Sequence, residues 1–567
     1  PAIDLKDPAQ NDLIREVTEG VVALTAKYGG LLWGEHGKGF RSEFVPETFG
    51  PLMPALEAVK RAFDPDDRMN PGKIASAKGH GLTRIDGVPR RGEQDRIIPA
   101  PVRRAFDEAL HCNGNGACFS FDADEAMCPS WKATRERRHS PKGRASLMRE
   151  WLRRAAAQGV DPAAELKRQS AGWWRDLAAT LRGMVRPRAG ADDFSHAVKE
   201  AMDGCLACKS CTGACPIKVD VPNFRAKFLA LYHTRYARPL KDHLVAALEP
   251  LLPLAARAPR LSNACLANPA ARLLLAKAGL VGIPALSPVD LTTRLADLGV
   301  AVATSVVLAQ LDPQERGRAV LVVQDAFTSH FDAEVVADSC ALLIALGFKP
   351  WLAPYRPNGK PLHVHGFLAR FAAVARSNAA MLRDFARQGV PLVGIDPSMT
   401  LTYRSEYAQA LGGDFDLPKV HLLQEWLATQ LDRIAPRQGG GALRLLPHCT
   451  ERTNAPAAVR DWQVLFAHLG LRLDVPAAGC CGMAGTYGHE ARHRPTSEAI
   501  YGLSWARHVA EAPGCTLLAD GYSCRSQAKL VDGVRLRHPA QALLEHVRNS
   551  GAGAAPFHPE QAAASAR

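Results

Sequence analysis

Residues 205–216 read CLACKSCTGACP, and this stretch determines the fold of the part of the chain around it. Its cysteines, Cys205, Cys208, Cys211 and Cys215, follow the spacing C-x2-C-x2-C-x3-C-P. In that spacing three thiolates surround one iron-sulfur cubane, and the fourth reaches a neighbouring cluster. A zinc site or a set of structural thiols does not need this fourfold run. The stretch therefore predicts a helical domain that binds 4Fe-4S clusters.

A second cysteine group, in CNGNGACFSFDADEAMCP at residues 112–129, is an imperfect copy of the first. It contains Cys112, Cys118 and Cys128, and Asn115 stands where the run would have its second cysteine. With the crossed ligation of two-cluster proteins, Cys128 would complete one 4Fe-4S cluster with Cys205, Cys208 and Cys211.

Three thiolates would then remain for a second cluster: Cys112, Cys118 and Cys215. Such a set could hold a 3Fe-4S cluster, a 4Fe-4S cluster with one ligand that is not cysteine, or no cluster. Packed thiols are the alternative for Cys112 and Cys118, because cysteine is often buried without a ligand.

A third group consists of Cys449, the adjacent pair Cys480 and Cys481, and Cys524. Neighbouring cysteines in a glycine-flanked turn do not easily form a disulfide with each other, but both can face a metal cluster. The group could bind a further cluster. Buried or redox-active thiols without metal remain the alternative, because Gly521 replaces the first cysteine of a closing C-x2-C. We expect the isolated Cys265, Cys340 and Cys515 to lie in the core.

Composition places the chain among globular proteins: 567 residues with 47% hydrophobic content are enough for roughly three to four domains. The net charge of +13 arises from scattered Lys and Arg, and the basic run at 135–138 lacks interleaved aromatics. This pattern favours a solvated surface over nucleic-acid binding. An anionic substrate or weak attraction to anionic lipid headgroups explains the net charge more economically than nucleic acid does. No secretory segment or membrane span is visible, so we expect a cytoplasmic protein, soluble or peripheral at the inner face of the membrane.

From about residue 318, short apolar runs alternate with helical segments, which predicts an α/β fold with a mostly parallel sheet. The expected strands are 319–323, 391–395, 443–446 and 516–519. The two halves form an internal repeat: Ala326 lies 31 residues before Pro357, as Cys449 lies 31 before Cys480. Met399 of the first half then matches Cys524 of the second, so that only the second half has cysteines at the cluster positions.

The predicted organisation is multidomain, α/β and α. We expect a domain remnant at 1–80, a helical cluster-binding domain with a charged insertion at 81–235, a helical linker at 236–317, a tandem α/β repeat at 318–550 and a disordered tail at 551–567. The first residues have the pattern of the middle of a domain, so we interpret the chain as a fragment. Oligomeric state, including a homo-oligomer, is left open.

The motifs HCTE, GCCGMAGTYGHE and GYSCRSQ resemble the cysteine-rich CCG domain. This domain occurs in heterodisulfide reductase, in the iron-sulfur component of glycolate oxidase and in anaerobic glycerol-3-phosphate dehydrogenase. The N-terminal GEHGKGFRSEF and AFDPDDRMNPGKI resemble the end of the FAD-linked oxidase C-terminal domain. Both signals in one chain are similar to the fused bacterial D-2-hydroxyglutarate dehydrogenases, in which an iron-sulfur half follows an FAD half. The resemblance implies that most of the FAD-binding half is missing here.

The resemblance also implies residue roles in the N-terminal part. Glu35 matches the family's ligand for a divalent metal, Zn or Mn, and His36 the neighbouring base or substrate ligand. Asn70 lies in the loop that approaches the flavin. In this chemistry a metal polarises the 2-hydroxyl, His takes its proton, and hydride passes to FAD.

The implied function is electron flow from a small 2-hydroxy acid to FAD, through 4Fe-4S clusters, to a quinone or another acceptor. D-2-hydroxyglutarate is the favoured substrate, followed by D-lactate or glycolate. The alternatives are a thiol redox enzyme like heterodisulfide reductase and a scaffold protein whose clusters only stabilise the fold.

Overall fold

The computed structural model describes residues 10–32, 39–87, 92–169, 193–412, 415–512 and 516–550, with single positions between 172 and 180. The chain divides into two compact units. The first comprises Pro1–Ala105 and Leu152–Asp161, and the second comprises Phe106–Trp151 and Pro162–Arg567. The predicted tail at 551–567 lies outside the described residues.

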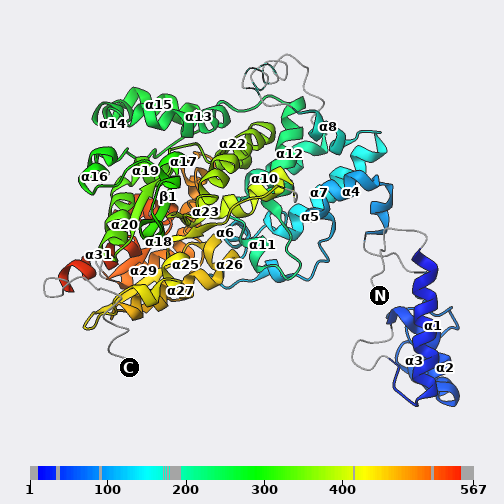
Figure 1. Cartoon of the computed structure of the whole chain (residues 1–567). Coiled ribbons are helices and arrows are strands. Elements are labelled where there is room, and N and C mark those ends of the chain that lie inside the picture. Colours follow the sequence, from blue (N-terminus) through cyan, green and yellow to red (C-terminus); the bar gives the residue numbers. More distant parts are fainter. Residues whose placement is uncertain are drawn as a thin grey trace, which may run out of the picture. The chain divides into compact units, whose positions relative to one another are not determined.

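The first unit is built from helices, which are dark to mid blue in Figure 1. Its small core contains Val22, Leu32 and Phe44. Arg15 binds Asp86 at 2.7 Å and Glu43 at 3.2 Å, which ties the first helix to the rest of the unit. The elements are α1 (Asn11–Lys27), η2 (Gly39–Phe44), α2 (Val45–Phe49), η3 (Gly50–Leu52), α3 (Met53–Phe63), η4 (Glu93–Ile97) and α4 (Ala100–Ala105).

The second unit begins with a helical part that contains the two N-terminal cysteine groups. Trp151 anchors it: the indole is buried against Phe228 and donates to Ser195 at 2.9 Å. Its elements are α5 (Asp107–Leu110), η5 (Ala117–Phe119), α6 (Pro129–Thr134), η6 (Arg137–His139), α7 (Pro141–Ala157), α8 (Pro162–Arg168), α10 (Phe194–Asp203), α11 (Ser210–Ala214) and α12 (Val221–Arg235).

A run of helices follows: α13 (Leu240–Ala255), α14 (Pro259–Ala267), α15 (Pro269–Lys277), α16 (Leu291–Asp297), α17 (Ser305–Ala309) and α18 (Pro313–Arg318). The expected Pro-broken pattern is present, since Pro250 and Pro253 lie inside α13. The prediction that Cys265 lies in the core is wrong, because α14 buries none of its residues and Cys265 is exposed. Cys340 is buried as expected, and Cys515 lies outside the described residues.

The α/β part contains two sheets whose named strands are all parallel. The first has the order β2-β1-β3-β4 and the second the order β6-β5-β7. The strands are β1 (Ala319–Val323), β2 (Lys349–Leu352), β3 (Leu392–Gly394), β4 (Val420–Leu422), β5 (Ala442–Leu446), β6 (Arg472–Asp474) and β7 (Leu517–Ala519). The predicted parallel α/β fold is therefore present.

Helices cover both sheets and complete the two halves. In the first half they are α19 (Ala326–Phe331), α20 (Ala333–Ala345), α21 (Lys360–Val364), α22 (Leu368–Ala386), α23 (Pro397–Arg404), α24 (Glu406–Leu411) and α25 (Leu423–Ala428), followed by η7 (Leu431–Arg433). In the second they are α26 (Cys449–Asn454), α27 (Pro456–His468), η8 (Tyr487–His489), α28 (Arg494–Leu503), α29 (Trp505–Glu511), α30 (Tyr522–Val531) and α31 (Pro539–Ser550).

The two halves repeat one topology, as the sequence predicts. The central strands β1 and β5 lead into α19 and α26, whose first residues are Ala326 and Cys449. The strands β3 and β7 lead into α23 and α30, whose third residues are Met399 and Cys524. One hydrophobic cluster includes Val320 of the first half and Leu445 of the second, so the halves share a core.

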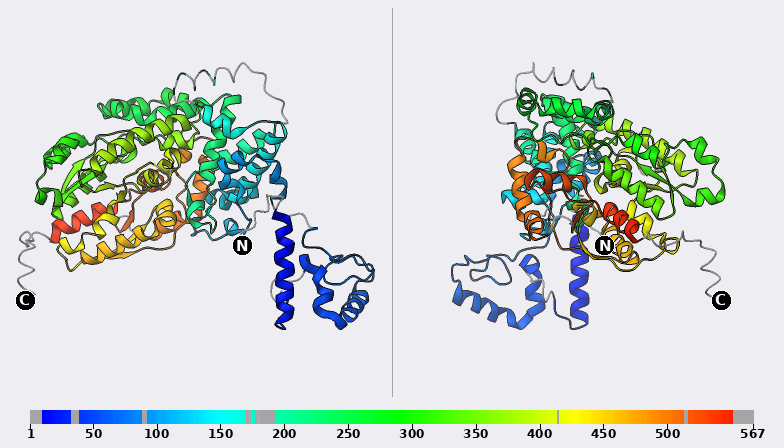
Figure 2. Two further views of the ribbon diagram at one scale, coloured as in Figure 1. Left: turned by 45° about the vertical axis from the view of Figure 1, so that its right-hand side comes forward. Right: turned by 90° about the vertical axis from the view of Figure 1, so that its left-hand side faces the viewer.

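The helical part and the second half of the repeat are in direct contact. In both views of Figure 2 the cyan helices lie beside the α/β part. Helix α11 packs on α26, and a Cβ at Gly213 would meet the Thr453 carbonyl oxygen at 2.0 Å. Among the described residues, no helix is long and apolar enough to cross a membrane.

Candidate functional site

The four cysteines predicted to hold the first cluster come together at one cavity. Cys205, Cys208 and Cys211 lie on the turn from α10 into α11, and Cys128 directly precedes α6. Left-handed backbone at Ala207 and Lys209, with φ of 55° and 57°, reverses the chain between the cysteines. All four line a cavity of about 300 Å³, which Arg144 also borders. This donor set, one thiol for each iron of a cubane, fits a 4Fe-4S cluster.

Backbone N–H groups point at three of these sulfurs. Trp131 donates to Cys128, Ser210 to Cys208 and Val221 to Cys211. Burial raises the pKa of the Cys211 thiol well above its usual range, and the neighbouring Cys208 adds to this. Such thiols ionise only when a metal or a cluster stabilises the thiolate, and N–H donors to the sulfurs help to set the potential of the cluster that is bound.

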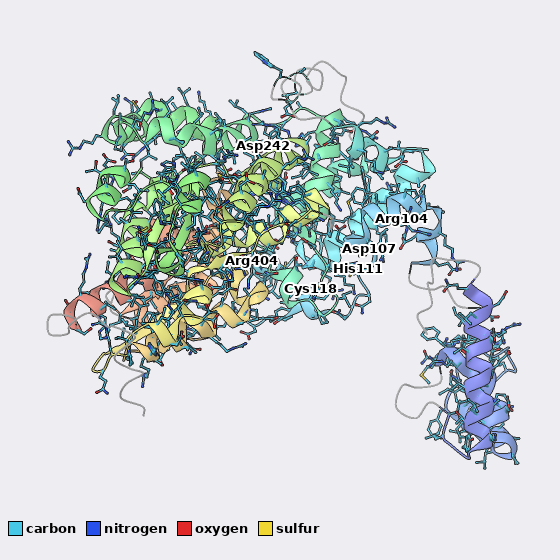
Figure 3. All side chains as sticks on the ribbon, in the orientation of Figure 1. Arg104, Asp107, His111, Cys118, Asp242 and Arg404 are labelled. Carbon is cyan, nitrogen blue, oxygen red and sulfur yellow. The ribbon has the colours of Figure 1, made fainter. Side chains whose placement is uncertain are left out.

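The second predicted set is less complete. Burial raises the pKa of Cys118, and the proximity of Cys128 and Cys112 raises it further. His111, beside Cys112, donates to the Ile217 carbonyl at 2.8 Å, which ties this loop to the segment after Cys215. Figure 3 shows His111 close to Asp107, with which it forms a 3.1 Å bond.

Asn115 does not face a cluster position. Its side chain is exposed, donates to Asn113 at 3.0 Å and accepts from the Ala117 N–H at 2.9 Å. These bonds stabilise its own turn. The structure therefore offers no fourth ligand from Asn115 in this conformation, and the three alternatives for this set remain.

The third cysteine group forms a line of contacting sulfurs. Hydrogen bonds join Cys449 to Cys480, Cys480 to Cys481 and Cys481 to Cys524. A hydrogen bond also joins Cys449 to Cys208 of the first group. That bond favours the Cys449 thiolate, but the contact with Cys480 and burial outweigh it and raise the pKa of Cys449 to about 12. The first and third cysteine groups are thus adjacent.

A larger cavity of about 910 Å³ adjoins these sulfurs. Cys205 and Cys208 line it from the helical part, and Cys449, Cys480 and Cys481 from the second half of the repeat. The first half contributes Lys360 and Asp396, among others. The repeat therefore builds a cavity between its halves, with thiols on one side.

Within the described residues, no three His, Cys, Asp or Glu side chains are arranged to hold a single metal ion. This arrangement differs from what a cluster needs. In a cluster each cysteine binds a different iron, so the thiols surround a volume and do not converge on one point. The cavity that the first group lines has this character.

In the first half of the repeat, carboxylates occupy the region that cysteines occupy in the second. Asp325 caps α19, Asp396 caps α23, and Glu249 from α13 accepts the Gly359 N–H at the start of α21 at 2.7 Å. Each carboxylate stabilises the positive end of a helix. Burial, together with the nearby Asp396, raises the pKa of Asp325 to about 7. At the positions that match the second half's cluster cysteines, the first half has no cysteine, as the repeat predicts, and these carboxylates lie nearby.

The residues predicted for 2-hydroxy acid oxidation belong to the first unit. Glu35 and His36 lie outside the described residues. Asn70 is exposed and adopts a left-handed conformation with φ of 51°, which asparagine tolerates. Its loop is fixed by Asp64, which accepts from Met69 N–H at 2.8 Å and from Lys60 at 2.6 Å.

Comparison with known proteins supports the resemblance of the N-terminal part to FAD-linked oxidases. Residues 1–74 match the family model of the C-terminal domain of FAD linked oxidases. The chain is 51% identical to D-2-hydroxyglutarate dehydrogenase of Pseudomonas putida over 551 residues, which is 97% of this chain and 54% of that protein. It is 50% identical to D-2-hydroxyglutarate dehydrogenase of Escherichia coli, again over 97% of this chain and 54% of that protein.

A more distant similarity covers a smaller part. One component of the anaerobic glycerol-3-phosphate dehydrogenase of Escherichia coli is 28% identical over 33% of this chain and 48% of its own length. The chain spans about half the length of the D-2-hydroxyglutarate dehydrogenases it matches. No solved structure matches it significantly.

Sequence reasoning missed the charged residues around the cysteines. Arg144 and Lys209 are buried beside them, with 1% and 4% of their surface exposed. The sequence shows Arg144 only as one of many basic residues near the run at 135–138, which is exposed as predicted. Lys209 could have been noticed because it lies inside the cysteine run, where a side chain has little access to solvent.

Proposed function

We propose that this chain carries electrons from a flavin-linked oxidation of a 2-hydroxy acid to an acceptor through iron-sulfur clusters. Cys128, Cys205, Cys208 and Cys211 hold the first 4Fe-4S cluster in this proposal. Cys449, Cys480, Cys481 and Cys524 form the next site along the path. Cys112, Cys118 and Cys215 form an additional site that holds a cluster only if another ligand completes it.

One observation carries this proposal: Cys128, distant in sequence from the other three, lines the same cavity as Cys205, Cys208 and Cys211. Crossed ligation of this kind is what two-cluster ferredoxin folds require. The contact between Cys208 and Cys449 supports the second step, because it places the third cysteine group beside the first. Electrons therefore have a continuous path from one cysteine group to the next.

The substrate side of the proposal rests on similarity. Residues 1–74 match the C-terminal domain of FAD linked oxidases, which supports FAD as the first electron acceptor. The relatives named D-2-hydroxyglutarate dehydrogenase favour D-2-hydroxyglutarate, with D-lactate and glycolate next. In the proposed site Glu35 binds a divalent metal, Zn or Mn, His36 takes the hydroxyl proton, and Asn70 approaches the flavin. The final acceptor is a quinone or another carrier, reached in the cytoplasm or at the inner face of the membrane.

The cluster assignment is tested by iron and sulfide analysis and low-temperature EPR of the anaerobically purified protein. Cys128→Ser and Cys211→Ser should each lose most of the signal of one reduced cluster. Cys340→Ser is the matched control, because Cys340 is fully buried but lies in α20, away from the three groups. Wild-type protein that contains no iron would refute the assignment, and so would full cluster content in both ligand variants.

The substrate assignment is tested by adding each hydroxy acid to oxidised full-length protein, in which this chain is joined to the implied FAD-binding half with FAD bound. D-2-hydroxyglutarate should reduce the clusters faster than D-lactate or glycolate. Clusters that accept electrons from dithionite but from none of the three acids would contradict the substrate proposal and favour a scaffold role.

A second candidate function is thiol chemistry on a disulfide substrate. The line of contacting sulfurs from Cys449 to Cys524, open to a cavity of about 910 Å³, favours it. This function would be supported over a cluster if the protein reduced a mixed disulfide, if the activity required Cys480 and Cys481, and if this group held no iron.

A further inference from the structure

The positive charge of Arg144 is buried among neutral hydrogen-bond acceptors. The residue lies on α7 and is almost completely buried, with 1% of its surface exposed. Its Nε donates to the Ala201 carbonyl at 2.8 Å, Nη2 to the Ser130 hydroxyl at 3.1 Å, and Nη1 to the His139 carbonyl. All three acceptors are neutral. Among the described residues, no carboxylate forms an ion pair with this guanidinium.

Three other buried cations of the second unit are paired with carboxylates, whereas buried Lys132 and Arg225 donate to backbone carbonyls. Arg525 lies 2.7 Å from Asp332, and Arg238 lies 3.7 Å from Asp242. Lys209, beside the same cavity, lies 3.4 Å from Asp220 and 3.7 Å from Glu406. An isolated cation in a low-dielectric interior costs several kcal/mol unless an anion compensates it. An anion beside Arg144 would therefore lower the cost of burying its charge.

The guanidinium of Arg144 lies beside the first cysteine group. Nη1 is 3.9 Å from Sγ of Cys128, and the guanidinium borders the cavity that the four cysteines share. A cubane with four thiolate ligands is an anion, and reduction adds one further electron to it.

We propose that Arg144 is a positioning residue whose positive charge offsets the charge of the cluster site and raises the reduction potential of the cluster there. The inference rests on the proposed function, because it requires a cluster at Cys128, Cys205, Cys208 and Cys211. A nearby positive charge stabilises the reduced, more negative form more than the oxidised form. Loss of that charge makes the cluster harder to reduce.

Three variants separate the charge of Arg144 from its hydrogen bonds. Arg144→Gln removes the charge but keeps a donor, and Arg144→Lys keeps the charge but loses the fork geometry. Ser130→Ala keeps the charge but removes the acceptor of Nη2 and a hydroxyl 3.8 Å from Cys128 Sγ, so it measures the effect of lost hydrogen bonds. Arg138→Gln is the surface control, because Arg138 is exposed and solvent screens its charge.

The experiment is a potentiometric titration of the anaerobic protein, followed by EPR, with iron and sulfide measured for each sample. The midpoint potential should shift to a more negative value in Arg144→Gln. It should stay near the wild-type value in Arg144→Lys and Arg138→Gln, and it should shift less in Ser130→Ala than in Arg144→Gln.

Two kinds of failure can be distinguished. Equal midpoints in wild type and Arg144→Gln, with full iron in both, would overturn the role of Arg144 and leave the cluster assignment standing. The same shift in Ser130→Ala as in Arg144→Gln would also overturn it, because geometry and not charge would then be the cause. Wild-type protein without iron would refute the proposed function itself. If Arg144→Gln does not retain its cluster, the comparison of Arg144→Lys with Ser130→Ala decides: a negative shift in the charge-retaining Arg144→Lys would overturn the inference.

Discussion

At the scale of single residues, Glu249 of α13, which binds the first half of the repeat, shows how a buried carboxylate makes stability depend on pH. Its carboxylate is 3% exposed and accepts the N–H groups of Gly359 at 2.7 Å and Asn358 at 3.3 Å. Burial outweighs these bonds and raises the pKa of Glu249 from 4.5 to about 7. Since the folded state holds this proton more tightly than the unfolded state, its contribution to stability declines as pH rises between those two values.

Glu249→Gln should therefore flatten the pH dependence of stability. The amide oxygen can still accept one of the two N–H groups, which bond different carboxylate oxygens in the wild type, but the amide does not ionise. From the size of the pKa shift, the Glu249 carboxyl should lower the stability of the wild type by up to about 3 kcal/mol between pH 4.5 and pH 7. This decrease should be absent from the variant. Thermal unfolding midpoints measured across this range check the effect. Glu315→Gln, at a carboxylate with 44% side-chain exposure, should change nothing; the same pH slope in Glu249→Gln and wild type would contradict the prediction.

Residues also show where sequence reasoning stops. Spacing alone predicted that Cys205, Cys208 and Cys211 act together, and the crossed ligation rule predicted Cys128 as their partner; the structure places all four at one cavity. The rule could not find Arg144, because a basic residue in a basic segment gives no signal of burial. Nor could it find the contact between Cys208 and Cys449, since nothing local in the sequence relates two such distant loops.

At the scale of elements, the packing of α11 on α26 depends on Gly213. A Cβ there would lie 2.0 Å from the Thr453 carbonyl oxygen, so Gly213→Ala forces the two helices apart. We expect a loss of about 1–3 kcal/mol in stability, as for other overpacked contacts. Thermal unfolding measures this. Gly502→Ala in α28 is the matched control, because its Cβ would meet nothing within 4 Å, and it should be neutral or slightly stabilising.

Elements differ in how well sequence predicts them. The strands β1, β3, β5 and β7 were predicted within a residue or two, because each is an apolar run before a helix N-terminus. The prediction did not include β2, β4 and β6, in which buried residues alternate with less buried ones. These strands are not continuous apolar runs, whereas β3 and β7, which are equally short, are buried throughout. Cys265 was misplaced for a similar reason, because an apolar helix such as α14 was assumed to be buried.

At the scale of the whole second unit, adjacent cysteine groups predict magnetic interaction. The Cys208–Cys449 contact brings the first and third groups together. If both hold reduced clusters, the EPR spectrum of the fully reduced protein should be broadened relative to that of the partly reduced protein. In Cys449→Ser the first cluster should keep a narrow signal at every potential. A fully reduced spectrum that is the simple sum of two independent signals would contradict this arrangement.

The interface between the helical part and the second half of the repeat has a consequence for the rate of electron transfer. Besides the close approach at Gly213, the Thr450 hydroxyl donates to the Cys208 carbonyl at 2.8 Å, and Asn454 donates to the Lys209 carbonyl at 3.3 Å. The loop that carries one set of thiols is thus fastened to the helix that carries the next. Electron tunnelling between them would cross a gap of constant width, with no swinging domain to wait for, and its rate should not change when glycerol or sucrose makes the solvent more viscous.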